Sequence, residues 1–133
     1  MKWVMVVVVI VLCALALKDT ESVEVCGREG CVLAEVSKDK EKGLAGRDSG
    51  RMLFIFEEEA EWKFWMKGMR YELDIVWMDG NWTVTRVEKG ELCKDECRVY
   101  EGMGKYVLEG ERGTAERIGT EEGNRVKVNY ISN

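Results

Sequence analysis

Residues 73–88 read LDIVWMDGNWTVTRVE, with the dipeptide Asp79-Gly80 between two runs rich in Val, Trp and Thr. β-Branched and aromatic residues favour strands, and Asp-Gly tolerates the positive φ that a type I′ turn requires. The stretch therefore predicts a β-hairpin whose two strands cover residues 73–78 and 82–88.

The rest of the chain continues this pattern of short apolar runs separated by glycine and charged residues. No segment after Leu17 shows helical periodicity over ten or more residues, so we expect a mainly β protein. Two short helical turns are predicted, one over residues 38–42 capped by Ser37 and one over residues 115–118 capped by Thr114. The further strands are expected at residues 23–26, 31–36, 52–56, 62–66, 106–109 and 125–130.

Composition limits the classes of function. The 133 residues carry 20 Lys and Arg against 25 Asp and Glu, and the net charge of −5 argues against a nucleic-acid-binding protein. There is no His, which excludes Ser-His-Asp and Cys-His catalysis and the usual zinc hydrolase sites. The lack of Gln and the many Glu, Lys, Arg and Val resemble the composition of hyperthermophile proteins.

The N-terminus carries an apolar segment, since Lys2 is followed by the uncharged residues 3–17. As a helix this segment spans about 22 Å, which is short for a bilayer core of roughly 30 Å and suits the apolar region of a signal peptide. An uncleaved membrane anchor and a buried strand or helix are the alternatives. The expected organisation is a signal peptide or anchor over residues 1–17, a linker over 18–22 and one β domain over 23–133.

The cysteines form two close pairs, Cys26 with Cys31 and Cys93 with Cys97. Removing Cys13 with a signal peptide leaves an even number, which suits two disulfides and an oxidising compartment. Four cysteines allow three connectivities, and the sequence does not choose among them. A zinc site with four thiolate ligands is an alternative, although these spacings are looser than the usual C-x2-C pairs. Free or redox-active thiols are the other alternative.

A series of motifs follows in a recognisable order and spacing: GLAGR at 43–47, GRMLFIF at 50–56, FWMK at 64–67, LDI at 73–75, YVLE at 106–109 and GTAER at 113–117. By these motifs the chain resembles the domain of unknown function 192 family over about residues 32–128. The resemblance implies a jelly-roll-like β-sandwich or barrel, often exported in prokaryotes, with no established biochemical activity. The family usually has Asn after Trp-Met-Lys and Pro before Leu-Asp, whereas this chain has Gly68 and Glu72.

Asp74 is the first candidate for a polar site, because strand alternation places it on the face opposite Leu73 and Ile75. A carboxylate removed from water must be paired, or its pKa rises. Arg47 and Lys67 are the expected partners. Such a pair is either structural or part of a ligand-binding cluster, and a catalytic role for Asp74 is the third possibility.

Trp65 is the second candidate, because alternation places it with Lys63 and Lys67, on the face opposite Trp62 and Phe64. A Trp between two cations is either packed against them or forms the floor of a shallow site for a sugar or peptide. The acidic segments 57–61 and 109–122 lack calcium-loop spacing and are expected to be solvated.

Three functions are consistent with these patterns. The leading one is an exported, non-enzymatic module that binds a small molecule, glycan or envelope protein through Arg47, Trp65, Lys67 and Asp74, without cofactor or metal. The second is a structural or interaction module of the cell envelope, held in the membrane through residues 3–17 if the segment is uncleaved. The third is a carboxylate-based hydrolase in which Asp74 works with Glu72 or Glu109. Each places the protein outside the cytoplasm, either secreted or anchored on the extracytoplasmic face.

Overall fold

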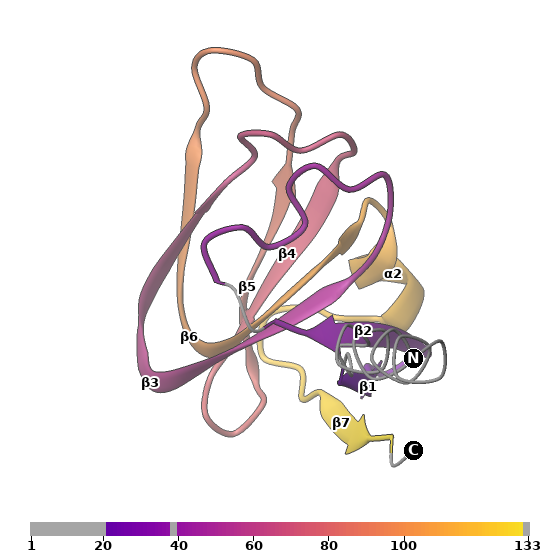
Figure 1. Cartoon of the computed structure of the whole chain (residues 1–133). Helices are drawn as coiled ribbons and strands as arrows, with labels where there is room; N and C mark the ends of the chain where they lie inside the picture. The colour runs from indigo at the N-terminus through magenta and orange to yellow at the C-terminus, as the bar shows by residue number, and fades with distance from the viewer. Residues whose placement is uncertain (1–20, 38–39, 132–133) are drawn as a thin grey trace, which may run out of the picture.

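The computed structural model describes residues 21–37 and 40–131 (Figure 1). The described strands form one seven-stranded mixed sheet in the order β5-β4-β6-β3-β2-β1-β7, and the helix in this part of the chain is α2, Thr114–Ile118. The prediction of a mainly β protein is confirmed. The strands are β1 Ser22–Cys26, β2 Cys31–Val36, β3 Met52–Trp65, β4 Leu73–Met78, β5 Val84–Gly90, β6 Val99–Glu111 and β7 Lys127–Tyr130.

β4 lies between β5 and β6, and each of its residues is buried. Neighbouring residues of a strand point to opposite faces, so β4 contributes to two cores. Val76 pairs with Leu108 on one face and Trp77 pairs with Val107 on the other. The sheet is therefore covered on both sides, as expected for a strand with a continuous apolar run.

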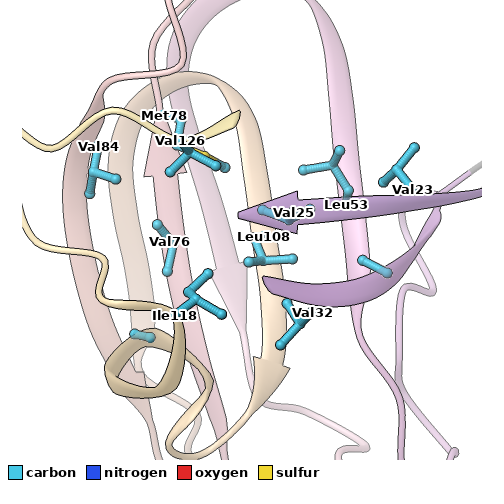
Figure 2. Packing of buried hydrophobic residues seen from close by; sticks show 12 residues of the cluster. Val23, Val25, Val32, Leu53, Val76, Met78, Val84, Leu108, Ile118 and Val126 are labelled. Atoms are coloured by element: carbon cyan, nitrogen blue, oxygen red, sulfur yellow. The ribbon is translucent and has the colours of Figure 1, made fainter. Parts of the chain in front are cut away.

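One face carries the core that we call the helix-side core, since α2 packs against it. It joins β1 and β2 to the centre of the sheet, and Figure 2 shows these side chains converging between the strands and the helix. Its buried members include Val23, Val25, Val32, Leu53, Val76, Met78, Val84, Leu108, Ile118 and Val126.

The opposite face carries a second, aromatic core, which we call the turn-side core, since Leu44 from the turn before β3 packs into it. The rings of Phe54 and Phe64 meet edge to face at 5.2 Å between centroids. The ring of Phe64 meets Trp77 in the same way at 6.0 Å. This core positions the residues around the candidate site described below.

β3 and β6 are long and curved, and they pair with each other along most of their length (Figure 1). The sequence predicts separate strands at 52–56 and 62–66, but β3 runs through both. The pairing register shifts between Ile55 and Ala60, so the exposed glutamates of 57–59 lie in an irregular part of a continuous strand. β6 also begins earlier than the predicted 106–109. The sequence does not indicate this first half of the strand, because it contains two glycines and few apolar residues.

The hairpin of β4 and β5 is confirmed, but its turn is not the predicted type I′. The Asp79 carboxylate accepts hydrogen bonds from the backbone N–H of Asn81 at 2.9 Å and of Thr83 at 3.0 Å. The positive φ, 63°, falls on Trp82 and not on Gly80. An Asp side chain that folds its own backbone in this way makes a longer loop than a two-residue turn.

The described strands pair into a single sheet whose long members bend. The two packed sheets of a jelly roll therefore stay a prediction. The signal peptide or anchor over 1–17 and most of the linker over 18–22 lie outside the described residues, as do residues 38–39 of the first predicted helical turn. Residues 40–46 form a turn. In the described ranges, no helix has the length and apolar character needed to cross a bilayer.

Both cysteine pairs are disulfides, and both are local: Cys26 bonds Cys31, and Cys93 bonds Cys97. The first joins the ends of β1 and β2, where the two residues are directly paired. In the described part of the chain, the one cluster with metal-ligand spacing is Glu24 with Cys26 and Cys31. Because all four of these cysteines are in disulfides, they do not form the four-thiolate zinc site.

Candidate functional site

Two of the four predicted site residues lie together. Trp65 ends β3 with 55% of its surface exposed, and the Lys67 Nζ lies 5.1 Å from the centroid of its ring. Phe64 packs against the turn-side core, so the predicted alternation is confirmed. Both residues line a cavity of about 390 Å³, which neither Arg47 nor Asp74 lines.

Arg47 lies in the segment between β2 and β3, and its Nη1 forms an ion pair with the Glu35 carboxylate. Both side chains are partly exposed. The predicted ion pair of Arg47 or Lys67 with Asp74 is wrong, because the cation beside Asp74 is Arg112, whose Nε lies 3.5 Å from Oδ1. Arg112 follows β6, which is the neighbour of β4 in the sheet. Because Arg112 and Asp74 are far apart in the sequence, no local sequence pattern indicates their contact.

Asp74 is buried, with 3% of its surface exposed. Its Oδ2 accepts hydrogen bonds from the backbone N–H of Gly113 at 2.9 Å and of Ala115 at 3.0 Å. These are N–H groups at the start of α2, so Asp74 caps the helix from a neighbouring strand. The predicted cap, Thr114, instead donates from its hydroxyl to the Glu111 carbonyl oxygen at 2.7 Å. Asp74 therefore has a structural role.

The carboxylate pairs considered for a hydrolase do not form a shared cleft. β4 and β6 pair Ile75 with Glu109 and Asp74 with Gly110, so Asp74 and Glu109 point to opposite faces of the sheet. Glu72 and Asp74 both contact Arg112, whose Nη1 lies 3.0 Å from the Glu72 Oε2. Both carboxylates therefore share one guanidinium partner, which suits a structural role.

The 390 Å³ cavity, which we call the Glu109 cavity, lies between the turn before β3 and the end of β3, with the turn-side core beneath it. Its apolar walls are Leu44, Phe54, Phe64, Trp65 and Met69. Its charged lining residues are Lys40, Glu41, Lys42, Lys63, Lys67 and Glu109. Among the described lining residues the four lysines outnumber the two acids, so this part of the lining carries a net positive charge.

Glu109 has 5% of its surface exposed, in a strand position that pairs with Met52 and Ile75. Gly43 permits the close approach of the turn, since a Cβ there would lie 3.7 Å from the Glu109 Oε2 and 3.1 Å from the Phe54 ring. Burial raises the pKa of Glu109 to about 7. In the part of the chain that the structure describes, no donor forms a hydrogen bond to this carboxyl.

The four lysines, which we call the lysine rim, are exposed, and none of them lowers the pKa of Glu109. The Lys40 Nζ lies 4.8 Å from the centroid of the Phe56 ring. The Lys63 Nζ lies 3.9 Å from the Glu101 Oε2. The lining of the cavity thus combines one buried carboxyl with exposed ammonium groups.

The sequence predicts a solvated acidic segment over residues 109–122, and for Glu109 this prediction is wrong, because its side chain is buried. The available signal was its phase: Glu109 lies two residues after Val107 and so shares the apolar face of β6. An acid in phase with buried residues is a candidate for a buried carboxyl.

Two solved structures are similar to this chain in fold. A crystal structure of a proposed transcription regulator from Sinorhizobium meliloti 1021 matches with a TM-score of 0.70 and 26% identity, covering 82% of this chain and 93% of that chain. A protein of unknown function from Novosphingobium aromaticivorans DSM 12444 matches with a TM-score of 0.65 and 24% identity, over 80% of this chain and 83% of that chain. No curated protein matches the sequence.

The family resemblance rests on more than the fold. The motif residues Leu44, Phe54, Phe64 and Glu109 line the cavity, and Asp74 of the Leu-Asp motif caps α2. A family model matches residues 24–128, which include every described strand except the ends of β1 and β7. The chain therefore belongs to the domain of unknown function 192 family, described as an uncharacterized ACR.

Proposed function

We propose that this protein is a non-enzymatic module that binds a small molecule in the Glu109 cavity. The observation that carries the proposal is the buried carboxyl of Glu109, which opens onto the cavity and has no donor among the described residues. Buried polar groups in proteins are almost always hydrogen-bonded, and exceptions with a strongly perturbed pKa concentrate at functional sites.

The walls of the cavity support the same function. Small-molecule sites are concave, mostly apolar and supplied with a few placed polar groups, at volumes of roughly 300–1,000 Å³. The Glu109 cavity has about 390 Å³ and aromatic walls from Phe54, Phe64 and Trp65. Trp65 and Lys67 remain in the proposed site, whereas Arg47 and Asp74 are replaced by Glu109.

The experiment is native mass spectrometry of the full chain expressed in an exporting host. We expect a non-covalent mass above that of the chain, lost in Trp65→Ala and in Glu109→Gln. Tyr130→Ala is the matched control, because Tyr130 is also a largely exposed aromatic residue and does not line the cavity. A bound mass that survives both cavity substitutions would contradict the proposal.

A second candidate, an interaction module of the cell envelope, is favoured by one observation. Trp65 pairs across the strands with Val99, and both are about half exposed, at 55% and 50%. Exposed apolar pairs of this kind suit a protein contact. If the candidate is correct, Val99→Ser prevents chemical cross-linking to an envelope protein while leaving small-molecule binding unchanged.

We also propose that the protein lies outside the cytoplasm, secreted or anchored on the extracytoplasmic face. Two disulfides support an oxidising compartment. The intact mass of the exported protein, measured after denaturation with thiol alkylation, tests this. A chain that begins at Leu17 with four unalkylated cysteines supports export by a cleaved signal, and a full-length chain with alkylated cysteines contradicts it.

A further inference from the structure

We infer that the Glu109 cavity takes an amphoteric ligand: a single-ring molecule with an ammonium group that pairs with Glu109 and a carboxylate or phosphate that the lysine rim binds. This inference rests on the proposed function and names the class of its ligand. It follows from the different exposure of the charges on one lining, where the carboxyl of Glu109 is buried and the four lysines are exposed.

A cation is the partner that the buried carboxyl of Glu109 lacks among the described residues. Taking a carboxylate out of water costs several kcal/mol unless a partner replaces the lost hydration, and no described residue supplies that partner to Glu109. No lysine of the rim lowers the pKa of Glu109, which burial alone raises. A ligand ammonium would restore the charge of the carboxylate and supply the missing donors.

The exposed lysines of the rim suit an anionic group of the ligand. Four lysines and one glutamate, Glu41, make the lining apart from Glu109 electropositive. Lys67 lies over the Trp65 ring and Lys40 over the Phe56 ring. A cation held over an aromatic face keeps N–H groups that can bind a carboxylate or phosphate.

The space between the charges suits one ring. Phe54, Phe64 and Trp65 offer aromatic surface on which a flat or apolar body can stack. The volume of about 390 Å³ lies at the small end of ligand sites. The ligand class is therefore an aromatic amino acid or a similar ring that carries both charges.

Three matched probes test the class by isothermal titration calorimetry on the full chain: phenylalanine, phenethylamine without the carboxylate, and 3-phenylpropanoate without the ammonium. We expect phenylalanine to bind about tenfold or more tightly than either of the others. Glu109→Gln is expected to reduce phenylalanine to the affinity of 3-phenylpropanoate. Glu58→Gln is the charge-matched control, since Glu58 is exposed and does not line the cavity, and it should leave all three affinities unchanged.

The rim is tested separately with Lys67→Gln, an exposed position whose replacement does not disturb a core. It should weaken phenylalanine and 3-phenylpropanoate but not phenethylamine. Lys94→Gln, in the loop closed by the second disulfide, is its control. If Lys67→Gln also abolished the binding of phenethylamine, which has no carboxylate, then the assignment of the ligand anion to the lysine rim and of the ligand ammonium to Glu109 would be overturned.

The pH dependence of binding shows whether the ionised Glu109 attracts or repels each probe. Among the described residues, the charged groups that line the cavity with Glu109 are Lys40, Glu41, Lys42, Lys63 and Lys67. Tyr71 is also near, since burial and then Glu109 raise its pKa to about 12. With its pKa raised to about 7 by burial, Glu109 is expected to change charge between pH 5 and 8. As it ionises, phenylalanine should bind more tightly and 3-phenylpropanoate less tightly.

Two outcomes would overturn the amphoteric class without affecting the proposed function. In one, 3-phenylpropanoate binds at least as well as phenylalanine and Glu109→Gln has no effect on either, so the cavity takes simple anions. In the other, none of the three probes binds, while native mass spectrometry still shows a bound mass that Trp65→Ala removes. Failure of the proposed function itself would appear as a wild-type bound mass that both cavity substitutions leave in place.

Discussion

The two buried carboxyls, Asp74 and Glu109, occupy opposite faces of the central sheet and meet opposite conditions. Asp74 accepts two backbone N–H groups and lies beside Arg112, so burial does not leave its charge uncompensated. Glu109 is surrounded by apolar strand neighbours and has a pKa raised to about 7 by burial. Backbone donors and a guanidinium hold the first carboxyl, whereas no described residue donates a hydrogen bond to the second.

Asp74→Ala is expected to destabilise the protein by about 2–3 kcal/mol, because two N–H groups at the start of α2 lose their acceptor and Arg112 loses a partner. Urea denaturation measures the difference. Asp48→Ala is the control, since Asp48 forms a surface ion pair with Arg70 and its side chain is 85% exposed; it should cost less than about 0.5 kcal/mol. Equal effects of the two substitutions would contradict the capping role of Asp74.

Gly68→Asn is expected to be nearly neutral, while Gly68→Val should cost about 1–2 kcal/mol. Gly68 has a φ of 77°, and an added Cβ would meet only an ordinary contact, 3.6 Å from the Ala45 Cβ. The cost is therefore conformational, and Asn tolerates the left-handed region better than other residues with a Cβ. Thermal unfolding of the two variants separates them, and an Asn variant as unstable as the Val variant would refute this explanation.

The same φ accounts for the departure from the family pattern at this position, because Asn and Gly are the two residues that suit a left-handed turn. Sequence alone could place Trp65 on an exposed face and Asp74 opposite Leu73, since both follow from alternation. It could not identify Arg112 as the partner of Asp74, because that contact depends on the pairing of β4 with β6.

At the level of elements, short strands with clear apolar runs were predictable. β2 and β4 begin and end where the sequence indicates, since each is bounded by turns or charged residues. The continuity of β3 was not predictable, because the glutamates of 57–59 are exposed at the register shift and break the apolar pattern without breaking the strand. A bulge leaves no clear mark in a sequence of charged residues.

The disulfide of Cys26 and Cys31 is expected to contribute about 2 kcal/mol, because it closes a loop of only about six residues in the chain-entropy model. The double substitution to Ala should lower the free energy of unfolding by that amount while the far-ultraviolet circular dichroism stays unchanged. The second disulfide, Cys93 with Cys97, closes a similarly short loop and should contribute about as much. Loss of the fold on removing either bridge would contradict local roles for both.

For the molecule as a whole, stability should depend on pH through Glu109. Its pKa is about 7 in the folded state against 4.5 as the ordinary value, so the folded protein binds this proton more tightly than the unfolded chain. The contribution is therefore complete below about pH 4.5 and is lost as the pH rises through about 7. The loss between pH 5 and pH 8 amounts to about 3 kcal/mol.

Glu109→Gln removes this dependence, so the variant is expected to become more stable than the wild type at pH 8 and not at pH 5. Urea denaturation at the two pH values, with Glu58→Gln as the surface control, measures the difference. If the variant and the wild type had the same free energy of unfolding at both pH values, folding would not raise the pKa of Glu109, and the explanation would be wrong.

The long pair of β3 and β6 has a consequence for the cooperativity of the molecule. Its residues belong to both cores: Leu53 and Leu108 to the helix-side core, and Phe54 and Val107 to the turn-side core. Separating the two strands on one face would expose the other face as well, so neither core can melt alone. The helix-side core and the turn-side core should therefore unfold in one transition. The amide hydrogens of β3 and β6 should exchange only when the whole molecule unfolds.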